Sequence, residues 1–493
     1  MSSLSLETNE SDDILHRKTT MNGEARVPDG TETAKKKFII RLLTEFHKSG
    51  TFTFRIEKII KRVSTEIKIN TQCTILPGKV IISFPEDQNE SPSKKPSYTF
   101  STAADDLVVA TFIDLVKIDH LERLYYDLVS KRVDLYDAND RLRRIENAAS
   151  VYNDHVKLLS RFFISASCAI MFYGGSWIDG AVGGILGMLT ALIDEFSEKI
   201  PGITYVLPFI NSLVVGLVGT LVDRWGFHGG NNNAGLCTKA YLLGGSVFQF
   251  PGLMITFAFL ELYSGQTMYG ATKLIHGICQ ASQIGFGLAM GYLLVAEEAD
   301  TPLSFEYGCS DSVDKVWDVI FIPFYTISLG IPLNSSMEQF IGSVISSIVA
   351  YVVYNGLDLM RLPFEIVPLF TAVALTTTSR LYAWFNGNEK PIVYTMMGLM
   401  MLTPGTMGVT GSFNTSMGES VTDGLAFTMR MIIAGVSISV GVFITLIPKL
   451  SWCWHHMRSE RSSSNLNNEN SHSLLQDDIE MSNRDRMRKE TTL

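Results

Sequence analysis

Residues 250–254 read Phe-Pro-Gly-Leu-Met, and residues 403–407 read Thr-Pro-Gly-Thr-Met. Each Pro-Gly pair lies within a long apolar stretch. Proline lacks a backbone donor and glycine lowers the cost of leaving α geometry, so a helix is expected to kink or break at both positions. The two pairs therefore predict two interrupted helices in the apolar part of the chain.

Charged residues are scarce around these two pairs. Of the 493 residues, 46% are hydrophobic and 18% charged, and residues 156–448 hold only 11 basic and 19 acidic side chains in 293 positions. A soluble domain averages about 25% charged residues, so this middle part is a membrane domain. The composition argues against a wholly soluble enzyme, and the net charge of −9 offers no basic surface for nucleic acid.

Ten stretches of the middle part are apolar enough to span a membrane, which requires about 20 mostly apolar residues. They are 157–175, 179–194, 204–222, 238–262, 272–295, 316–333, 336–356, 363–385, 391–411 and 424–448. A Pro-Gly pair falls in the fourth stretch of each group of five. Repeats with an odd number of spans insert in opposite orientations, and broken helices at matching positions indicate a transporter's binding site. The alternative is two structural kinks in a helix bundle.

The fold class expected is mainly α, with a ten-helix polytopic membrane domain of two five-helix inverted repeats. A small cytosolic α+β domain precedes it, because residues 34–155 combine amphipathic helical periodicity with strands at 71–76, 79–84 and 107–113. The polar ends are expected to form a disordered N-terminal tail and a disordered cytoplasmic tail. The remaining boundaries are 1–33 and 449–493 for the tails, 156–295 for membrane repeat 1, 296–315 for an acidic exterior loop and 316–448 for membrane repeat 2.

The distribution of charge also predicts an orientation, because basic residues favour the cytoplasmic side of a membrane. Arg141, Arg143 and Arg144 precede the first span and Lys449 follows the last. The loop 296–315 is acidic instead. An even number of spans leaves both termini on one side, so both are expected in the cytoplasm. The sequence does not say which membrane holds the chain.

The six cysteines form no CxxC and have no zinc-like spacing with histidine. Cys168, Cys237 and Cys279 lie in or beside apolar stretches, where a thiol commonly acts as a small core residue. The chain is therefore not expected to be a disulfide scaffold, and no cofactor or metal site is expected.

Several motifs together resemble one family. They are Gly50 between the first two helices of the soluble domain, Tyr173-Gly174-Gly175-Ser176-Trp177-Ile178-Asp179, Phe250-Pro251-Gly252 followed by Glu261-Leu262, Gly270, Lys273, Gly285-Phe286-Gly287 and Gly291, and finally Pro404-Gly405. In this order, over about residues 38–448, the chain resembles the threonine/serine exporter family, including its fungal branch of pheromone-regulated membrane proteins. The resemblance implies a ten-span, proton-coupled exporter of small neutral amino acids with two related halves.

Two positions depart from what this resemblance leads us to expect. Thr406 stands where a small, serine-like residue is expected after the second Pro-Gly pair. Lys273 stands where the basic residue is often arginine, so a point charge would replace bidentate recognition of a carboxylate.

The candidate substrate-binding residues are Pro251, Gly252, Pro404, Gly405 and Gln280. The freed backbone groups and half-helix dipoles at the two breaks can hold the ends of a small zwitterion. Gln280 can bind substrate or hold helices together through a hydrogen bond.

Three ionisable residues are candidates for coupling or for a charge pair, since such groups are costly within a membrane. Asp179 could couple transport to protons or cap the second span, and both interpretations remain open. Glu261 and Lys273 are expected to pair across a short turn as a structural clamp, with proton carriage by Glu261 as the alternative.

The function expected is therefore export of small neutral amino acids by a multi-pass membrane protein. The partners expected are the lipid bilayer, a small amino-acid substrate and protons as the coupling ion, without nucleic acid, and a homo-oligomer is left open. One alternative is a membrane-anchored interaction or signalling protein without transport activity. Another is a membrane-tethered hydrolase using His47 or His120, but no catalytic motif accompanies them, so the chain is not expected to be an enzyme.

Overall fold

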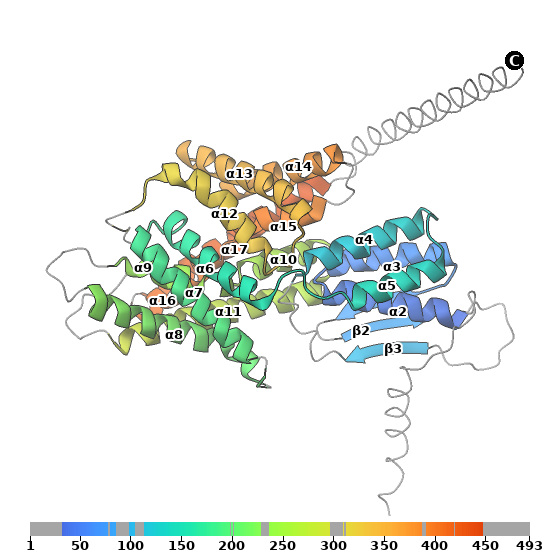
Figure 1. Ribbon diagram of the computed structural model, residues 1–493, viewed down its shortest axis with the longest axis horizontal. Helices are drawn as coiled ribbons and strands as arrows, with labels where there is room; N and C mark the ends of the chain where they lie inside the picture. Colours follow the sequence, from blue (N-terminus) through green and yellow to red (C-terminus); the bar gives the residue numbers. More distant parts are fainter. Residues whose placement is uncertain are drawn as a thin grey trace, which may run out of the picture. The chain divides into compact units, whose positions relative to one another are not determined.

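The computed structural model describes residues 32–76, 79–84, 98–103, 113–197, 199–200, 202–227, 236–295, 309, 312–386, 391–418 and 420–446 (Figure 1). The chain divides into two compact units on either side of Ala149. The described part is mainly helical, as the sequence predicts, with one small sheet.

The first unit begins with two amphipathic helices, α2 (Glu32–Lys48) and α3 (Thr53–Ile67). Their predicted apolar faces are buried in the core of this unit. The buried residues are Ile39, Leu42, Leu43 and Phe46 of α2 with Ile56, Ile59, Ile60, Val63 and Ile67 of α3. Gly50 has a φ of 84°, a left-handed conformation that glycine adopts readily, and it separates the two helices.

The sheet of this unit has three antiparallel strands in the order β1-β2-β3. β1 (Gln72–Leu76) and β2 (Lys79–Phe84) form the predicted hairpin, with Ile75 opposite Val80. The third strand, β3 (Tyr98–Ala103), pairs with β2 and was not predicted from the sequence. Residues 107–112 of the strand expected at 107–113 lie outside the described residues, and Ile113 is not in a strand.

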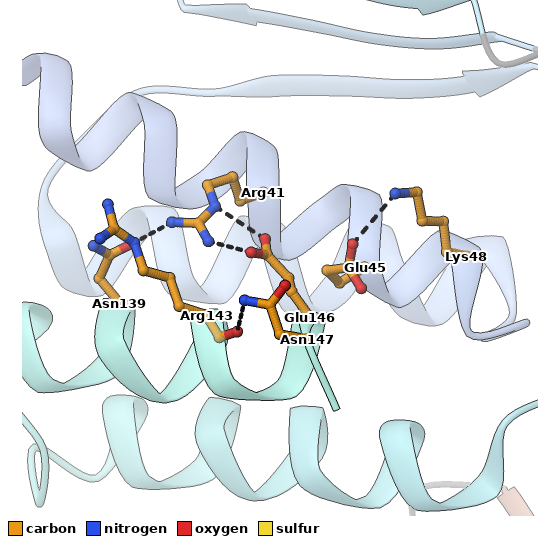
Figure 2. A network of polar contacts seen from close by, with 7 residues as sticks. All are labelled: Arg41, Glu45, Lys48, Asn139, Arg143, Glu146 and Asn147. Carbon is orange, nitrogen blue, oxygen red and sulfur yellow. Dashed lines mark hydrogen bonds and ion pairs between the residues drawn. The ribbon is translucent and has the colours of Figure 1, made fainter. Parts of the chain in front are cut away.

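Two further helices, α4 (Leu115–Val129) and α5 (Leu135–Glu146), complete the unit. Asp114 caps α4, because its carboxylate accepts a hydrogen bond from the backbone N of Lys117 at 2.9 Å. Figure 2 shows how α5 is joined to α2: Arg41 donates from Nε to Glu146 at 2.9 Å and from Nη1 to Asn139 at 3.0 Å.

A buried ion pair crosses the same unit. Arg55 of α3 donates to Glu122 of α4 at 2.6 Å, and the Glu122 side chain is fully buried. Burial lowers the pKa of Arg55, but attraction and hydrogen bonding by Glu122 outweigh it and raise the pKa above its ordinary value. Of the two histidines of the hydrolase hypothesis, His47 is buried in α2 and His120 is exposed on α4.

The second unit contains a helix in each of the ten predicted apolar stretches. In the first group the helices are α6 (Asp154–Met171), α7 (Trp177–Ser197), α8 (Leu207–Val222), α9 (Thr238–Ser246), α10 (Gly252–Tyr263) and α11 (Thr267–Leu293). In the second group they are α12 (Asp318–Gly330), α13 (Met337–Leu359), α14 (Val367–Phe385), α15 (Pro391–Leu402), α16 (Gly405–Ser416) and α17 (Val421–Leu446).

Length and apolar composition identify only some of these helices as candidate membrane spans. Five qualify: Trp177–Ser197, Leu207–Trp225, Met337–Leu359, Pro391–Ser416 and Gly424–Thr445. The bent pair Thr238–Gln249 and Gly252–Tyr263 makes a sixth if it is one span. These spans are found among the described residues, and a total of ten stays a prediction. The glycine-rich second stretch, predicted to be the shortest, is a helix of 21 residues.

Helix contacts in the second unit follow the same pattern in both groups. α6 packs on α7, α7 on α9 and α8 on α11, while α12 packs on α13, α13 on α15 and α14 on α17. The groups meet where α6 packs on α12 and also through the helices that follow the breaks, since α10 packs on α17 and α16 packs on α11. Figure 1 shows α12 to α15 gathered in the upper part of the second unit and α7 to α9 in its lower part.

Glycine allows the closest of these contacts. Gly216 of α8 and Gly287 and Gly291 of α11 lie where the two helices meet, and a Cβ on Gly216 would lie 2.5 Å from the carbonyl oxygen of Leu288. Small residues four positions apart let helix backbones approach closely within a membrane. The α8–α11 pair is therefore closely packed where these glycines meet.

Candidate functional site

Both Pro-Gly pairs interrupt a helix, as predicted. The residues before Pro251 form a short 3-10 turn, η4 (Val247–Gln249), and α10 then begins at Gly252. In the second group α15 ends at Leu402 and α16 begins at Gly405. The two prolines have nearly the same backbone angles, with φ −78° and ψ 20° at Pro251 and φ −83° and ψ 22° at Pro404.

The two breaks lie directly against each other. A Cβ added to Gly252 would lie 2.6 Å from the backbone N of Gly405, and a Cβ added to Gly405 would lie 2.8 Å from the backbone N of Gly252. Real Cβ contacts are not this short. The contact is therefore backbone to backbone, and only glycine fits at either position.

The first turns of two helices consequently meet at this point. The first N–H groups of a helix have no partner within that helix, and its N-terminus carries partial positive charge. Neither Pro251 nor Pro404 caps its helix with a side chain. The arrangement brings together Pro251, Gly252, Pro404 and Gly405, four of the five candidate substrate-binding residues.

Polar side chains lie near the contact between Gly252 and Gly405, which we call the crossing. Gln280 of α11, the fifth candidate, donates from Nε2 to the backbone carbonyl of Gln249 at 2.9 Å. The hydroxyls of Tyr173 and Thr406 are hydrogen-bonded at 3.1 Å. The side-chain amide of Gln249 is buried at both its polar atoms, without a hydrogen-bond partner among the described residues.

Asp179 serves as a structural connector at one end of the first group. It accepts hydrogen bonds from the backbone N and the hydroxyl of Ser176, both at 2.8 Å, and from the backbone N of Cys237 at 2.8 Å. Its side chain thus joins the start of α7 to the start of α9. This geometry favours capping over proton coupling.

Glu261 and Lys273 lie near the turn between α10 and α11, away from the breaks. Glu261 is fully buried. The ammonium of Lys273 lies 4.6 Å from the centroid of the Tyr269 ring, and Lys273 and Glu261 interact electrostatically. Because Glu261 is nine residues beyond Gly252, it lies roughly 13 Å along the helix from the first break.

Sequence inspection missed a buried charge cluster in the first group. Arg161 of α6 lies 3.6 Å from Asp194 of α7, and Asn211 of α8 donates to Asp194 at 2.7 Å. The guanidinium carbon of Arg161 lies 3.1 Å from the centroid of the Phe248 ring, in the turn before Pro251. A signal was present in the sequence, because Arg161 and Asp194 both lie inside predicted spans.

A disulfide corrects the prediction that Cys237 is a core residue. Cys237, next to α9, is bonded to Cys309 between the two groups, with Cα atoms 5.6 Å apart and 72 residues of separation. In the described ranges no three His, Cys, Asp or Glu side chains come close enough to hold a metal ion.

Comparison with known proteins gives one family match. Residues 37–295 match a family described as "Putative threonine/serine exporter". The chain is similar to pheromone-regulated membrane protein 10 of Kluyveromyces lactis, with 24% identity over 434 residues, covering 84% of this chain and 43% of that protein. The proteins of the same name in Candida glabrata and Saccharomyces cerevisiae are each 24% identical, covering 65% of this chain and 38% and 39% of their own lengths. The chain thus spans about two fifths of these relatives. No solved structure gives a significant match.

Proposed function

The chain belongs to the threonine/serine exporter family, and from this premise we propose that it is a proton-coupled secondary transporter that exports small neutral amino acids. The observation that carries the proposal is the reciprocal contact of Gly252 and Gly405, which brings two helix breaks together. Broken helices at matching positions of two halves are the feature expected of a transporter's binding site.

The packing of the helices supports an organisation in two five-helix repeats. Each contact of α6, α7 and α9 with one another has a counterpart among α12, α13 and α15. The pairs α8–α11 and α14–α17 correspond in the same way. Two halves with the same packing and one shared crossing can rock about that crossing, which is how alternating access works in repeat-based transporters.

In the proposed site the substrate lies beside the crossing, because the glycines themselves occupy the point of contact. The N-termini of α10 and α16 converge there and favour the anionic end of the substrate, since helix N-termini attract anions. Gln249 and Gln280 supply hydrogen-bonding side chains next to the first break, and the hydroxyls of Tyr173 and Thr406 bond to each other next to the second.

The disulfide supports an orientation with both termini in the cytoplasm. Disulfides persist in oxidising compartments, so the Cys237–Cys309 end is proposed to face the exterior or a lumen. The segment after α6 lies at this end, because the backbone N of Val313 donates to the carbonyl of Gly175 at 3.5 Å. The opposite end of α6, where the chain enters it, then faces the cytoplasm.

Within this scheme Glu261 remains the proposed clamp partner of Lys273. Asp179 is proposed to hold the exterior ends of α7 and α9 together, because its carboxylate already accepts three hydrogen bonds. The lipid bilayer is the proposed surrounding medium and protons are the proposed coupling ion.

Efflux from vesicles tests the proposal. Purified full-length protein would be reconstituted in liposomes loaded with labelled L-threonine, L-serine, L-alanine or glycine, with and without a proton gradient. We expect efflux above that of protein-free liposomes, faster when protons move inward against the exported substrate. Efflux no faster than from protein-free liposomes for every substrate, by protein that is monodisperse and shows cooperative unfolding, would contradict the proposal.

A further inference from the structure

The charge cluster of the first group joins three helices. Arg161 comes from α6, Asp194 from α7 and Asn211 from α8. Arg161 is 8% exposed and Asn211 is fully buried, while the Asp194 side chain is 26% exposed. Asp194 is close to the end of α7 that lies opposite Asp179, so the cluster faces the proposed cytoplasmic side.

The cluster leaves the arginine incompletely paired. The Arg161–Asp194 separation of 3.6 Å is longer than the roughly 2.8 Å of a charge-assisted hydrogen bond. Within the described part of the chain, the buried Nη1 of Arg161 has no hydrogen-bond partner, and neither has Oδ1 of Asn211. A buried ion pair offsets its desolvation only with close geometry and with its remaining hydrogen bonds satisfied. The pair with Asp194 alone therefore contributes little to the stability of the fold.

The position of the guanidinium suggests a role for the unpaired donor. Its carbon lies 3.1 Å from the centroid of the Phe248 ring. The next residue in the chain is Gln249, whose amide also has no partner among the described residues, and Pro251 follows. The unpaired Nη1 of Arg161 and the unpaired amide of Gln249 are therefore both close to the turn that precedes the first break, where the proposed substrate binds.

We propose that Arg161 is the receptor for the carboxylate of the transported molecule and that Asp194 is the internal group it displaces. The planar guanidinium carries several donors that match a carboxylate in geometry and charge. In the structure Asp194 lies 3.6 Å from the guanidinium, and Asn211 donates a hydrogen bond to Asp194. An incoming carboxylate pairs with Nη1 and competes with Asp194 for the same cation. The inference rests on the proposed function and specifies the group by which that site recognises its substrate.

The proposal predicts opposite effects for two substitutions. Arg161→Gln removes the receptor, so binding of a carboxylate should weaken about tenfold or more, the factor expected for a hydrogen bond to a charged group. Asp194→Asn removes the competitor but keeps a side chain of the same shape, so binding should tighten. If the cluster only held helices together, both variants would weaken binding.

Ligand-induced stabilisation of the full-length protein in detergent measures this without relying on flux. The probes are L-threonine and L-threoninamide, which differ in the carboxylate. We expect L-threonine to raise the melting temperature of the wild type and L-threoninamide to raise it much less. Arg161→Gln should lose that difference, and Asp194→Asn should show it at lower threonine concentration.

A replacement variant and the KM for efflux make the test conclusive. If Arg161→Gln does not fold, Arg161→Lys replaces it, since a lysine point charge should retain weaker selectivity for the carboxylate. Undiminished discrimination in Arg161→Gln, equal weakening in both variants, or no stabilisation of the wild type by threonine would overturn the inference. Threonine efflux by the wild type with an unchanged KM in Arg161→Gln would overturn it while leaving the proposed function intact.

Discussion

The helical segments on the two sides of the first Pro-Gly break are bent by 47° relative to each other, whereas the second break leaves residues 391–416 within a single candidate span. The prolines themselves do not explain this, because their backbone angles nearly coincide. The residues before them differ. Val247–Gln249 form a 3-10 turn, which is tighter than an α turn. Thr403 follows the end of α15 and donates from its hydroxyl to the carbonyl of Met400 of that helix at 2.9 Å.

The polar and charged side chains near the two breaks also differ. The first break follows Phe248 and Gln249, which connect it to Arg161 and leave a buried amide unpaired. The second break contacts the first group through Thr406 and Tyr173. Both breaks share one backbone geometry, but the described buried charges near the crossing belong to the first group. If the proposed transport function holds, the first break is the one that carries polar groups for the substrate.

Substituting either glycine tests whether the two breaks depend equally on their backbone contact. Of the changes predicted, these substitutions should lower stability and transport the most. Gly252→Ala and Gly405→Ala each place a Cβ against backbone atoms of the other break. Each should lower the free energy of unfolding by about 1–3 kcal/mol, the usual cost of overpacking, and should abolish transport. Thermal unfolding in detergent and vesicle efflux are the measurements.

A matched control and a double variant sharpen this test. Gly356 of α13 has open space where its Cβ would lie, so Gly356→Ala should be neutral or stabilise by roughly 0.5–1 kcal/mol through helix propensity. In the double variant the second alanine should cost less than the first, because the crossing has already opened. Strictly additive costs would mean that the two breaks do not touch.

A second test asks whether the side chains that bind the substrate lie only beside the first break. Gln249→Leu removes a buried unpaired amide, so the fold should gain about 1 kcal/mol, the lower range of the cost of an unsatisfied buried group, while transport falls. Thr403→Val removes a hydrogen bond to the last turn of α15 and should change the free energy of unfolding and the transport rate less. Melting temperatures and initial efflux rates give the two readouts. Reduced transport in Thr403→Val alone would reverse the assignment of the two breaks.

Much of the fold could be predicted from the sequence because its signals are local. Apolar stretches located the helices of the second unit, and the two Pro-Gly pairs located the breaks. β3 was missed because its sequence, Tyr-Thr-Phe-Ser-Thr-Ala, is mixed in polarity and follows a polar stretch. α11 begins at Thr267, before the predicted 272, because helices extend beyond the apolar residues that reveal them.

The site could be predicted only in part, because its contacts join residues that are far apart in the sequence. The breaks could be recognised as a pair, but their direct contact depends on how the two groups pack. The pairing of Cys237 with Cys309 and that of Arg161 with Asp194 join residues far apart in sequence. Arg161 and Asp194 each lie near the end of an apolar stretch, where a charge normally belongs to the membrane surface. Only the packing of α6 on α7 reveals that Arg161 is buried.

The smallest expected effect concerns the link from the first group to the second break. Tyr173 and Thr406 share one hydrogen bond at 3.1 Å, so a double-mutant cycle with Tyr173→Phe and Thr406→Val should give a coupling of about 0.5–1.5 kcal/mol. If the second break moves against the first group during transport, this bond forms in one conformation only. Tyr173→Phe should then change the efflux rate by up to about tenfold while altering substrate affinity little. A coupling near zero in the unfolding free energy, or a change confined to affinity, would instead place Tyr173 among the groups that contact the substrate.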